Sequence, residues 1–161
     1  MQSNYFCEMI RFPELNLPAF NFEIDNGKIF DSIRKKWVSL TPEEWVRQNF
    51  LSYLIYYKKY SKSLIHSEET IQSFNKTKRC DAVIYSNEID PLLILECKAP
   101  HVKINDKTFK QIAVYNAAVK APYLIITNGL DHYCCKINFN DNSFSFLDEI
   151  PDYQLLREIN S

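Results

Sequence analysis

The sequence has only two glycines among its 161 residues, which excludes long, flexible, glycine-rich linkers. No apolar run approaches the about 20 residues that cross a membrane as a helix, and no secretory leader pattern opens the chain. The GxxxxGK[ST] phosphate loop is also missing, so we expect no ATP site. We therefore expect a single domain, residues 1–161, with its own hydrophobic core and a cytoplasmic location.

An excess of charge of one sign is missing as well, because 19 basic and 20 acidic residues give a formal net charge of −1. Nucleic-acid binding would have to come from a local basic patch. Residues 34–36 and 76–79 are the two candidate clusters, and we interpret the first as a solvated surface. Five cysteines without a CxxC pair indicate a reducing compartment. We interpret Cys134 and Cys135, near His132, as buried apolar thiols, because no second ligand pair is spaced to complete a zinc site.

The order of apolar patterns predicts an α/β fold. Alternating apolar residues around Asn26-Gly27 predict a β-hairpin arm over residues 18–30. Thr41, Pro42 and Glu44 have the spacing of a helix start with a capping box, and an apolar stripe continues this helix to Ile55. Further on, the pattern predicts strands 63–71, 80–86 and 91–98, helix 106–120, strands 122–127 and 132–139, and a short strand at 144–147. We expect a central mixed sheet flanked by helices, with the arm in 1–32, a core in 40–130 and C-terminal strands and tail in 131–161.

The stretch RCDAVIYSNEIDPLLILECKAP, residues 79–100, carries the candidate chemistry. Asp81 begins one apolar run, and Glu96 and Lys98 end the next. Residues two apart on a strand share a face, so Glu96 and Lys98 are neighbours, and a hairpin of the two runs brings Asp81 to them. Two carboxylates beside an ammonium suit a divalent cation and an activated water, as phosphodiester cleavage needs. The alternative is a surface salt bridge, which the strongly apolar run before Glu96 disfavours.

Several blocks together carry a family resemblance. They are Leu40-Thr-Pro-Glu-Glu-Trp-Val-Arg47-Gln48, Arg79-Cys-Asp81, Glu96-Cys-Lys98-Ala-Pro100, Gln111-x-x-x-Tyr115-Asn116 and Tyr123-Leu-Ile-Ile-Thr127-Asn128-Gly129. Over nearly the whole chain, these blocks resemble the N-terminal nuclease domain of type I restriction enzyme R subunits, a branch of the PD-(D/E)XK nuclease superfamily. The resemblance implies a restriction-endonuclease-like core. R subunits carry a DNA-translocating motor after this domain, so the chain looks like a stand-alone form without the motor.

The resemblance also implies roles for individual residues. Asp81, Glu96 and the backbone carbonyl of Cys97 would hold Mg²⁺, for which Mn²⁺ can substitute. Lys98 would position the attacking water and offset phosphate charge, and Gln111 would contact the DNA backbone or the water. Glu68 is a further candidate acid for a metal, with a solvent-facing glutamate as the alternative. The supporting candidates are Glu44, for which helix capping is the alternative role, and Tyr115; the candidate phosphate contacts are Lys78, Arg79, Lys107 and Lys110.

These expectations describe a metal-dependent deoxyribonuclease of restriction or defence type, a hydrolase acting on DNA, with RNA left open as a substrate. The expected partners are DNA and either a second copy of the chain or another member of a restriction system, with no membrane. The alternative is a catalytically silent nuclease-fold module that binds nucleic acid or a partner protein. The presence of Asp81, Glu96 and Lys98 together disfavours that alternative.

Overall fold

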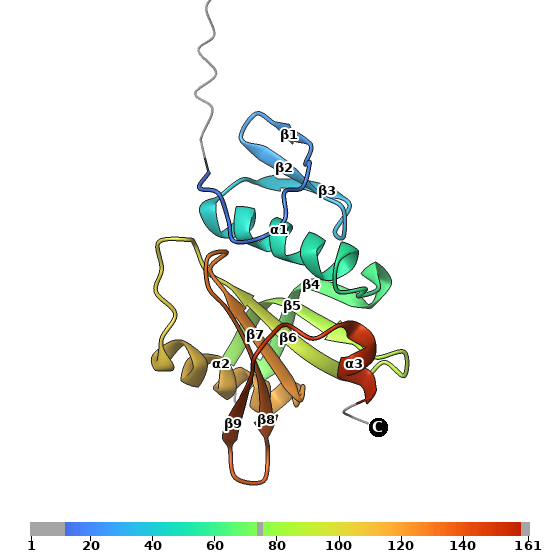
Figure 1. The fold of residues 1–161 in the computed structure, drawn as a ribbon, viewed down its shortest axis with the longest axis vertical. Helices are drawn as coiled ribbons and strands as arrows, with labels where there is room; N and C mark the ends of the chain where they lie inside the picture. Colours follow the sequence, from blue (N-terminus) through green and yellow to red (C-terminus); the bar gives the residue numbers. More distant parts are fainter. Residues whose placement is uncertain (1–11, 74–75, 159–161) are drawn as a thin grey trace, which may run out of the picture.

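A six-stranded mixed sheet forms the centre of the fold in the computed structural model, which describes residues 12–73 and 76–158 (Figure 1). Its strand order is β4-β5-β6-β7-β8-β9, and only β6 and β7 run parallel. The strands are β4 (Ile65–Ser73), β5 (Lys76–Tyr85), β6 (Pro91–Cys97), β7 (Tyr123–Thr127), β8 (His132–Asn138) and β9 (Ser143–Leu147). The parallel pair requires a crossover, which helix α2 (Asp106–Val119) supplies. The expected mixed sheet with flanking helices is therefore confirmed.

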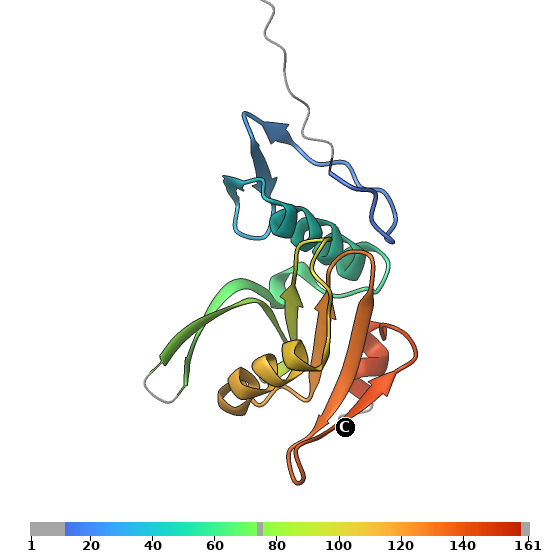
Figure 2. The ribbon, with the colours of Figure 1, turned by 90° about the vertical axis from the view of Figure 1, so that its left-hand side faces the viewer.

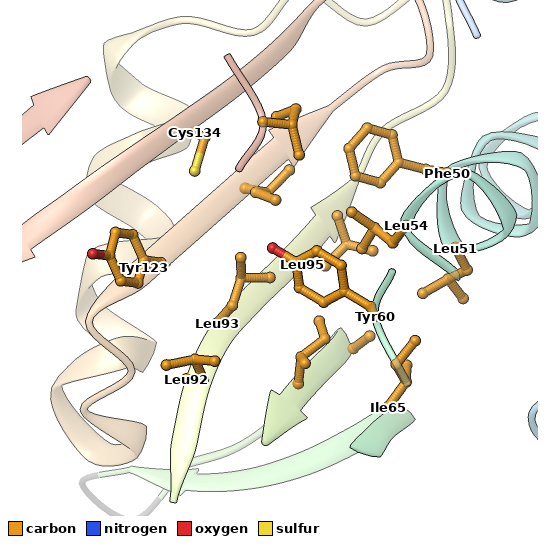
Figure 3. Packing of buried hydrophobic residues seen from close by; sticks show 14 of the residues in the cluster. Phe50, Leu51, Leu54, Tyr60, Ile65, Leu92, Leu93, Leu95, Tyr123 and Cys134 are labelled. Atoms are coloured by element: carbon orange, nitrogen blue, oxygen red, sulfur yellow. The ribbon is translucent and has the colours of Figure 1, made fainter. Parts of the chain in front are cut away.

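Helices cover the two faces of this sheet. Helix α1 (Pro42–Tyr56) packs on one face, and α2 covers the other (Figures 1 and 2). Successive residues of β6 alternate between the two cores: Leu93 and Leu95 pack under α1, whereas Ile94 packs under α2. Figure 3 shows the hydrophobic core on the α1 side of the sheet, which includes Phe50, Leu51, Leu54, Tyr60, Ile65, Tyr123 and Cys134. A strand buried on both faces explains why the sequence of β6 is continuously apolar.

The N-terminal part forms a separate three-stranded antiparallel sheet of β1 (Ile24–Asp25), β2 (Lys28–Asp31) and β3 (Lys36–Ser39). Asn26 and Gly27 both have positive φ, 46° and 71°, as a tight hairpin turn requires. The hairpin lies where the sequence predicts it, but β3 was not predicted, because four residues are too short a pattern. In Figure 1 this sheet lies on the side of α1 that faces away from the central sheet.

Several boundaries differ from the prediction. The expected strand 63–71 begins as a single 3-10 turn, Lys62–Leu64, before β4, and β5 starts four residues earlier than expected. A short helix, α3 (Tyr153–Glu158), was also missed; it buries Leu156 in the core beneath α1. No helix in 12–73 and 76–158 is both long and apolar enough to cross a membrane.

Candidate active site

The middle of β5 and the end of β6 bring Asp81, Glu96 and Lys98 together. The two strands pair antiparallel with Ala82 opposite Leu95, which sets Asp81 beside Glu96. The backbone N–H of Cys97 donates to Asp81 Oδ2 at 2.6 Å, and Lys98 Nζ lies 3.1 Å from Glu96 Oε1. The convergence expected from the hairpin and the period-two rule is therefore present in the structure.

Burial makes this group electrostatically unusual. The side chain of Glu96 is only 13% exposed. Its burial, together with the negative charge of Asp81, raises the pKa of Glu96 to about 7 despite the nearby Lys98. Burial by itself would lower the pKa of Lys98, but Glu96, Glu43 and Asp81 outweigh it and raise that pKa. Lys98 is therefore an ammonium at neutral pH, suited to holding a water or a phosphate oxygen rather than to removing a proton.

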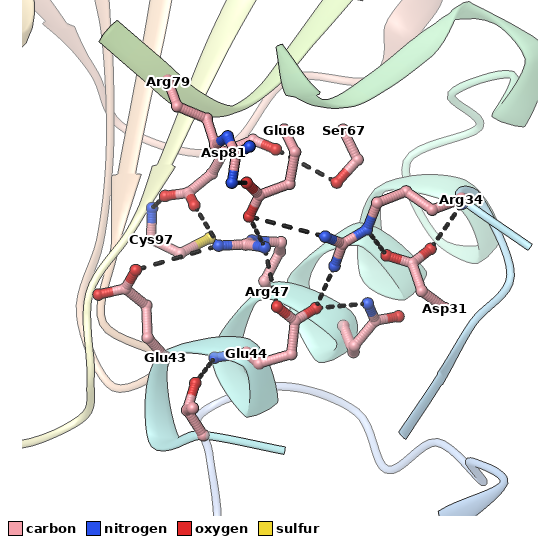
Figure 4. Close-up of polar contacts among 12 residues, drawn as sticks. Asp31, Arg34, Glu43, Glu44, Arg47, Ser67, Glu68, Arg79, Asp81 and Cys97 are labelled. Carbon is pink, nitrogen blue, oxygen red and sulfur yellow. Dashed lines mark hydrogen bonds and ion pairs between the residues drawn. The ribbon is translucent and has the colours of Figure 1, made fainter. Parts of the chain in front are cut away.

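A cluster of arginines and carboxylates adjoins Asp81 (Figure 4). Arg47 of α1 is 5% exposed and donates to Asp81 Oδ1 at 2.5 Å, to Glu44 Oε2 at 2.8 Å and to Glu68. Arg34, from the turn between β2 and β3, donates to Glu44 Oε1 at 2.9 Å and to Asp31 Oδ2 at 2.5 Å. The interpretation of residues 34–36 as a solvated cluster is therefore wrong for Arg34.

Arg47 was missed by the sequence reasoning, although a signal was present. The residue occurs within the Leu40–Gln48 block and precedes Phe50, Leu51 and Leu54 by three, four and seven positions. Those are the spacings of one helical face. A charged residue on an otherwise buried stripe needs a partner of opposite charge, and here the partners are the acids of the candidate site.

Glu68 occupies an irregular position in β4. The pairing register stays the same across this position, because Ser67 pairs with Ala82 and Glu69 with Cys80, with one residue between them on each strand; the φ of Glu68, however, is 59°. A left-handed residue inside a strand departs from extended backbone, and this changes the direction of its side chain. The carboxylate of Glu68 bonds to Arg47, lies 2.9 Å from Arg79 and 3.7 Å from Arg34, and is 18% exposed. Glu68 therefore lies in the arginine cluster rather than facing solvent.

The two adjacent glutamates at the start of α1 point to different partners. Thr41 caps the helix by accepting from the Glu44 N–H at 3.1 Å, but the Glu44 side chain does not return to Thr41 and instead accepts from Arg34, Arg47 and Gln48. Only half of the expected capping box forms. Glu43, which the sequence reasoning did not select, is half-exposed, and its pKa is raised by partial burial and by the charge of Asp81. It also acts electrostatically on Glu96 and Lys98.

Helix α2 contributes less directly. The ring of Tyr115 is buried and lies beneath the ammonium of Lys78, 3.4 Å from the ring centroid. Gln111, one turn earlier, is exposed, and its side chain makes no hydrogen bond to the residues that the structure describes. Lys107 and Lys110 are exposed on the first half of α2, and the 69%-exposed Arg79 side chain pairs with Glu68. The candidate phosphate contacts are thus accessible, and so is Gln111.

The donor chemistry of the site fits a magnesium ion rather than zinc. Within the described ranges no three acidic, histidine or cysteine side chains form a ready metal cage. Mg²⁺ commonly uses one or two carboxylates and completes its shell with water and phosphate. Asp81 and Glu96 supply two such carboxylates, and each Asp81 oxygen, although it accepts one hydrogen bond, keeps a second lone pair. Burial raises the pKa values of Cys134 and Cys135 to about 12, as expected for inert thiols.

The chain is similar in sequence and in fold to known restriction-enzyme proteins. The family model described as the type I restriction enzyme R protein N terminus matches residues 42–151. Among solved structures, a fragment described as an HsdR subunit of a type I restriction enzyme from Vibrio vulnificus YJ016 matches with a TM-score of 0.53 and 14% identity. The match covers 72% of this chain and 24% of the other, so the chain spans about a quarter of that protein's length. At this identity the likeness shows a shared fold. None of the curated proteins matches.

Proposed function

Since this chain belongs to the family of type I restriction enzyme R protein N-terminal domains, we propose that it is a metal-dependent deoxyribonuclease with a PD-(D/E)XK core. One observation carries the proposal: two carboxylates, the buried Asp81 and the partly buried Glu96, lie beside the ammonium of Lys98 at the end of β6. A structural ion pair would match one acid with one base. Here Asp81 contacts Arg47 and Glu96 contacts Lys98, yet the charge of Asp81 still raises the pKa of Glu96, and a divalent cation between the two acids would relieve this repulsion.

In this proposal each residue has a defined task. Asp81, Glu96 and the Cys97 carbonyl hold Mg²⁺, which supplies charge neutralisation and lowers the pKa of a water. Lys98, protonated at neutral pH, orients that water and a phosphate oxygen. The candidate nucleic-acid contacts Lys78, Arg79, Lys107 and Lys110 position the backbone without reading the base sequence. Gln111, exposed on α2, contacts the DNA backbone or the attacking water.

The contact between Arg47 and Asp81 favours a second candidate function, a silent module of the same fold. An acid that is already paired with a buried arginine has less need of a cation, and a site of that kind can serve binding alone.

Under the nuclease proposal the partner is DNA, within a restriction or defence system, and a double-strand break would use two copies of the site. The two functions differ in whether metal-dependent cleavage occurs.

Cleavage assays separate the two functions. Supercoiled plasmid, linear duplex, single-stranded DNA and RNA would each be incubated with Mg²⁺, Mn²⁺ or EDTA. We expect metal-dependent cutting of DNA that falls at least about 100-fold in Lys98→Ala and Asp81→Asn. Lys28→Ala, an exposed lysine of β2, is the matched control and should cut like the wild type. Folded wild type that cuts nothing with either metal would favour the silent module, and cutting of RNA alone would reassign the substrate.

A further inference from the structure

Arg47 is held by carboxylates on several sides. Its Nη1 bonds to Glu44 Oε2 and to Glu68, its Nη2 lies 2.5 Å from Asp81 Oδ1, and Glu43 lies 4.0 Å away. These acids come from α1, β4 and β5, so the guanidinium joins three elements at the candidate site. Burial of a charged group is tolerated only with such partners.

We propose that Arg47 stands in the place of a second metal ion, so that this site binds one divalent cation. The inference rests on the proposed nuclease function, because it concerns the same site. Centres with two metals hold them about 3.5 to 4 Å apart, close enough to share ligands. In this chain one oxygen of Asp81 is bonded to Arg47 and the other to the Cys97 N–H. Asp81 therefore bridges a guanidinium and the β6 backbone.

The acids on the α1 and β4 side are already neutralised. One oxygen of Glu68 is bonded to Arg47 and the other to Arg79. One oxygen of Glu44 accepts from Arg34 and Gln48, and the other accepts from Arg47. Each carboxylate oxygen of these two glutamates has a basic or amide partner, so neither needs a metal to balance its charge.

The acids on the other side of Asp81 remain less neutralised. Glu96 has Lys98 as its contacting partner, through one oxygen, within the described residues. Among residues 12–73 and 76–158, Glu43 has only the 4.0 Å pair with Arg47, and its side chain is 45% exposed. The remaining capacity for a cation therefore lies with Asp81, Glu96 and Glu43. A second ion could enter only if Arg47 left, and Glu44 and Glu68 would then each lose one hydrogen-bonded charged partner. Arg47 therefore stays in place, and the site holds only the first ion.

The number of bound ions tests this inference without measuring cleavage. The full chain would be titrated with Mn²⁺, and the free ion followed by electron paramagnetic resonance. We expect one Mn²⁺ per chain in the wild type and at least about tenfold weaker binding in Asp81→Asn. Two ions per chain in the wild type would overturn the inference and leave the nuclease proposal standing. Folded wild type that binds none would overturn the nuclease proposal itself.

Variants of the cluster sharpen the test. Arg47→Lys keeps a positive charge and should still bind one Mn²⁺, whereas Arg47→Met removes the charge at similar length and should bind two. Arg47→Met could fail to fold, so Glu68→Gln provides an independent test. In Glu68→Gln the number of bound Mn²⁺ ions per chain should stay at one. Glu69→Gln, the neighbour outside the arginine cluster, is the matched control. A loss of Mn²⁺ in Glu68→Gln that Glu69→Gln does not share would make Glu68 a ligand and refute the inference.

Discussion

Glu96 should make the stability of the fold depend on pH in a defined direction. Its burial, with the charge of Asp81 nearby, raises its pKa from 4.5 to about 7. The folded state therefore prefers the neutral carboxyl, and the unfolded chain releases the proton more easily. The contribution of Glu96 to the free energy of unfolding is present below pH 4.5 and is lost as the pH rises towards 7. Glu96→Gln cannot ionise and should escape this loss.

The size of the effect follows from the shift. A difference of 2.5 between the two pKa values corresponds to about 3 kcal/mol at 1.36 kcal/mol per unit. Roughly 2 kcal/mol of it falls between pH 5 and pH 8, since the unfolded carboxyl is already partly ionised at pH 5. Glu96→Gln should therefore gain about 2 kcal/mol relative to the wild type between these two conditions. Asp31, whose pKa is lowered in spite of its burial by hydrogen bonds from Arg34, titrates in both proteins and cancels in the difference.

Urea unfolding in EDTA near pH 5 and near pH 8 measures this quantity directly. The wild type, Glu96→Gln and the exposed control Glu149→Gln would be compared under the same conditions. A stability difference between Glu96→Gln and the wild type that is the same at both pH values would mean that Glu96 titrates normally. The conclusion that Asp81 and Glu96 repel each other in a partly buried site would then be wrong.

Three further predictions concern the scaffold, each measured by urea unfolding. Asn116→Ala should lose about 2 kcal/mol, because the buried amide both donates to and accepts from Ala121; Asn116→Asp, which would bury a carboxylate against the Ala121 carbonyl, should lose more. Gly129→Ala should lose about 1 to 2 kcal/mol, since φ is +85° there and the added Cβ would lie 2.7 Å from Leu15 Cδ2; an unchanged stability would mean that this turn relaxes freely. Lys120→Gly should gain roughly 0.5 to 1 kcal/mol, because Lys120 ends α2 at φ 59°; a loss would show that its side chain stabilises the fold.

The parts of the site that follow simple geometric rules were accessible from the sequence. Strand alternation and a hairpin suffice to bring Asp81, Glu96 and Lys98 together. The choice between Glu43 and Glu44 was not accessible, because adjacent residues at a helix start differ only in direction, and the partner Arg34 comes from a distant turn. The irregular backbone at Glu68 was equally hidden, since a left-handed glutamate inside a strand leaves no pattern in the sequence.

The N-terminal sheet matters to the candidate site through Arg34. Asp31, fully buried at the end of β2, accepts from the backbone N–H groups of Ile33 and Arg34 and from the Arg34 side chain, and so fixes the turn before β3. From that turn Arg34 neutralises one oxygen of Glu44. The other oxygen of Glu44 accepts a hydrogen bond from Arg47, whose second terminal nitrogen donates to Asp81. The arm is thus part of the charge balance around Asp81, and its folding is linked to the site through a chain of hydrogen bonds.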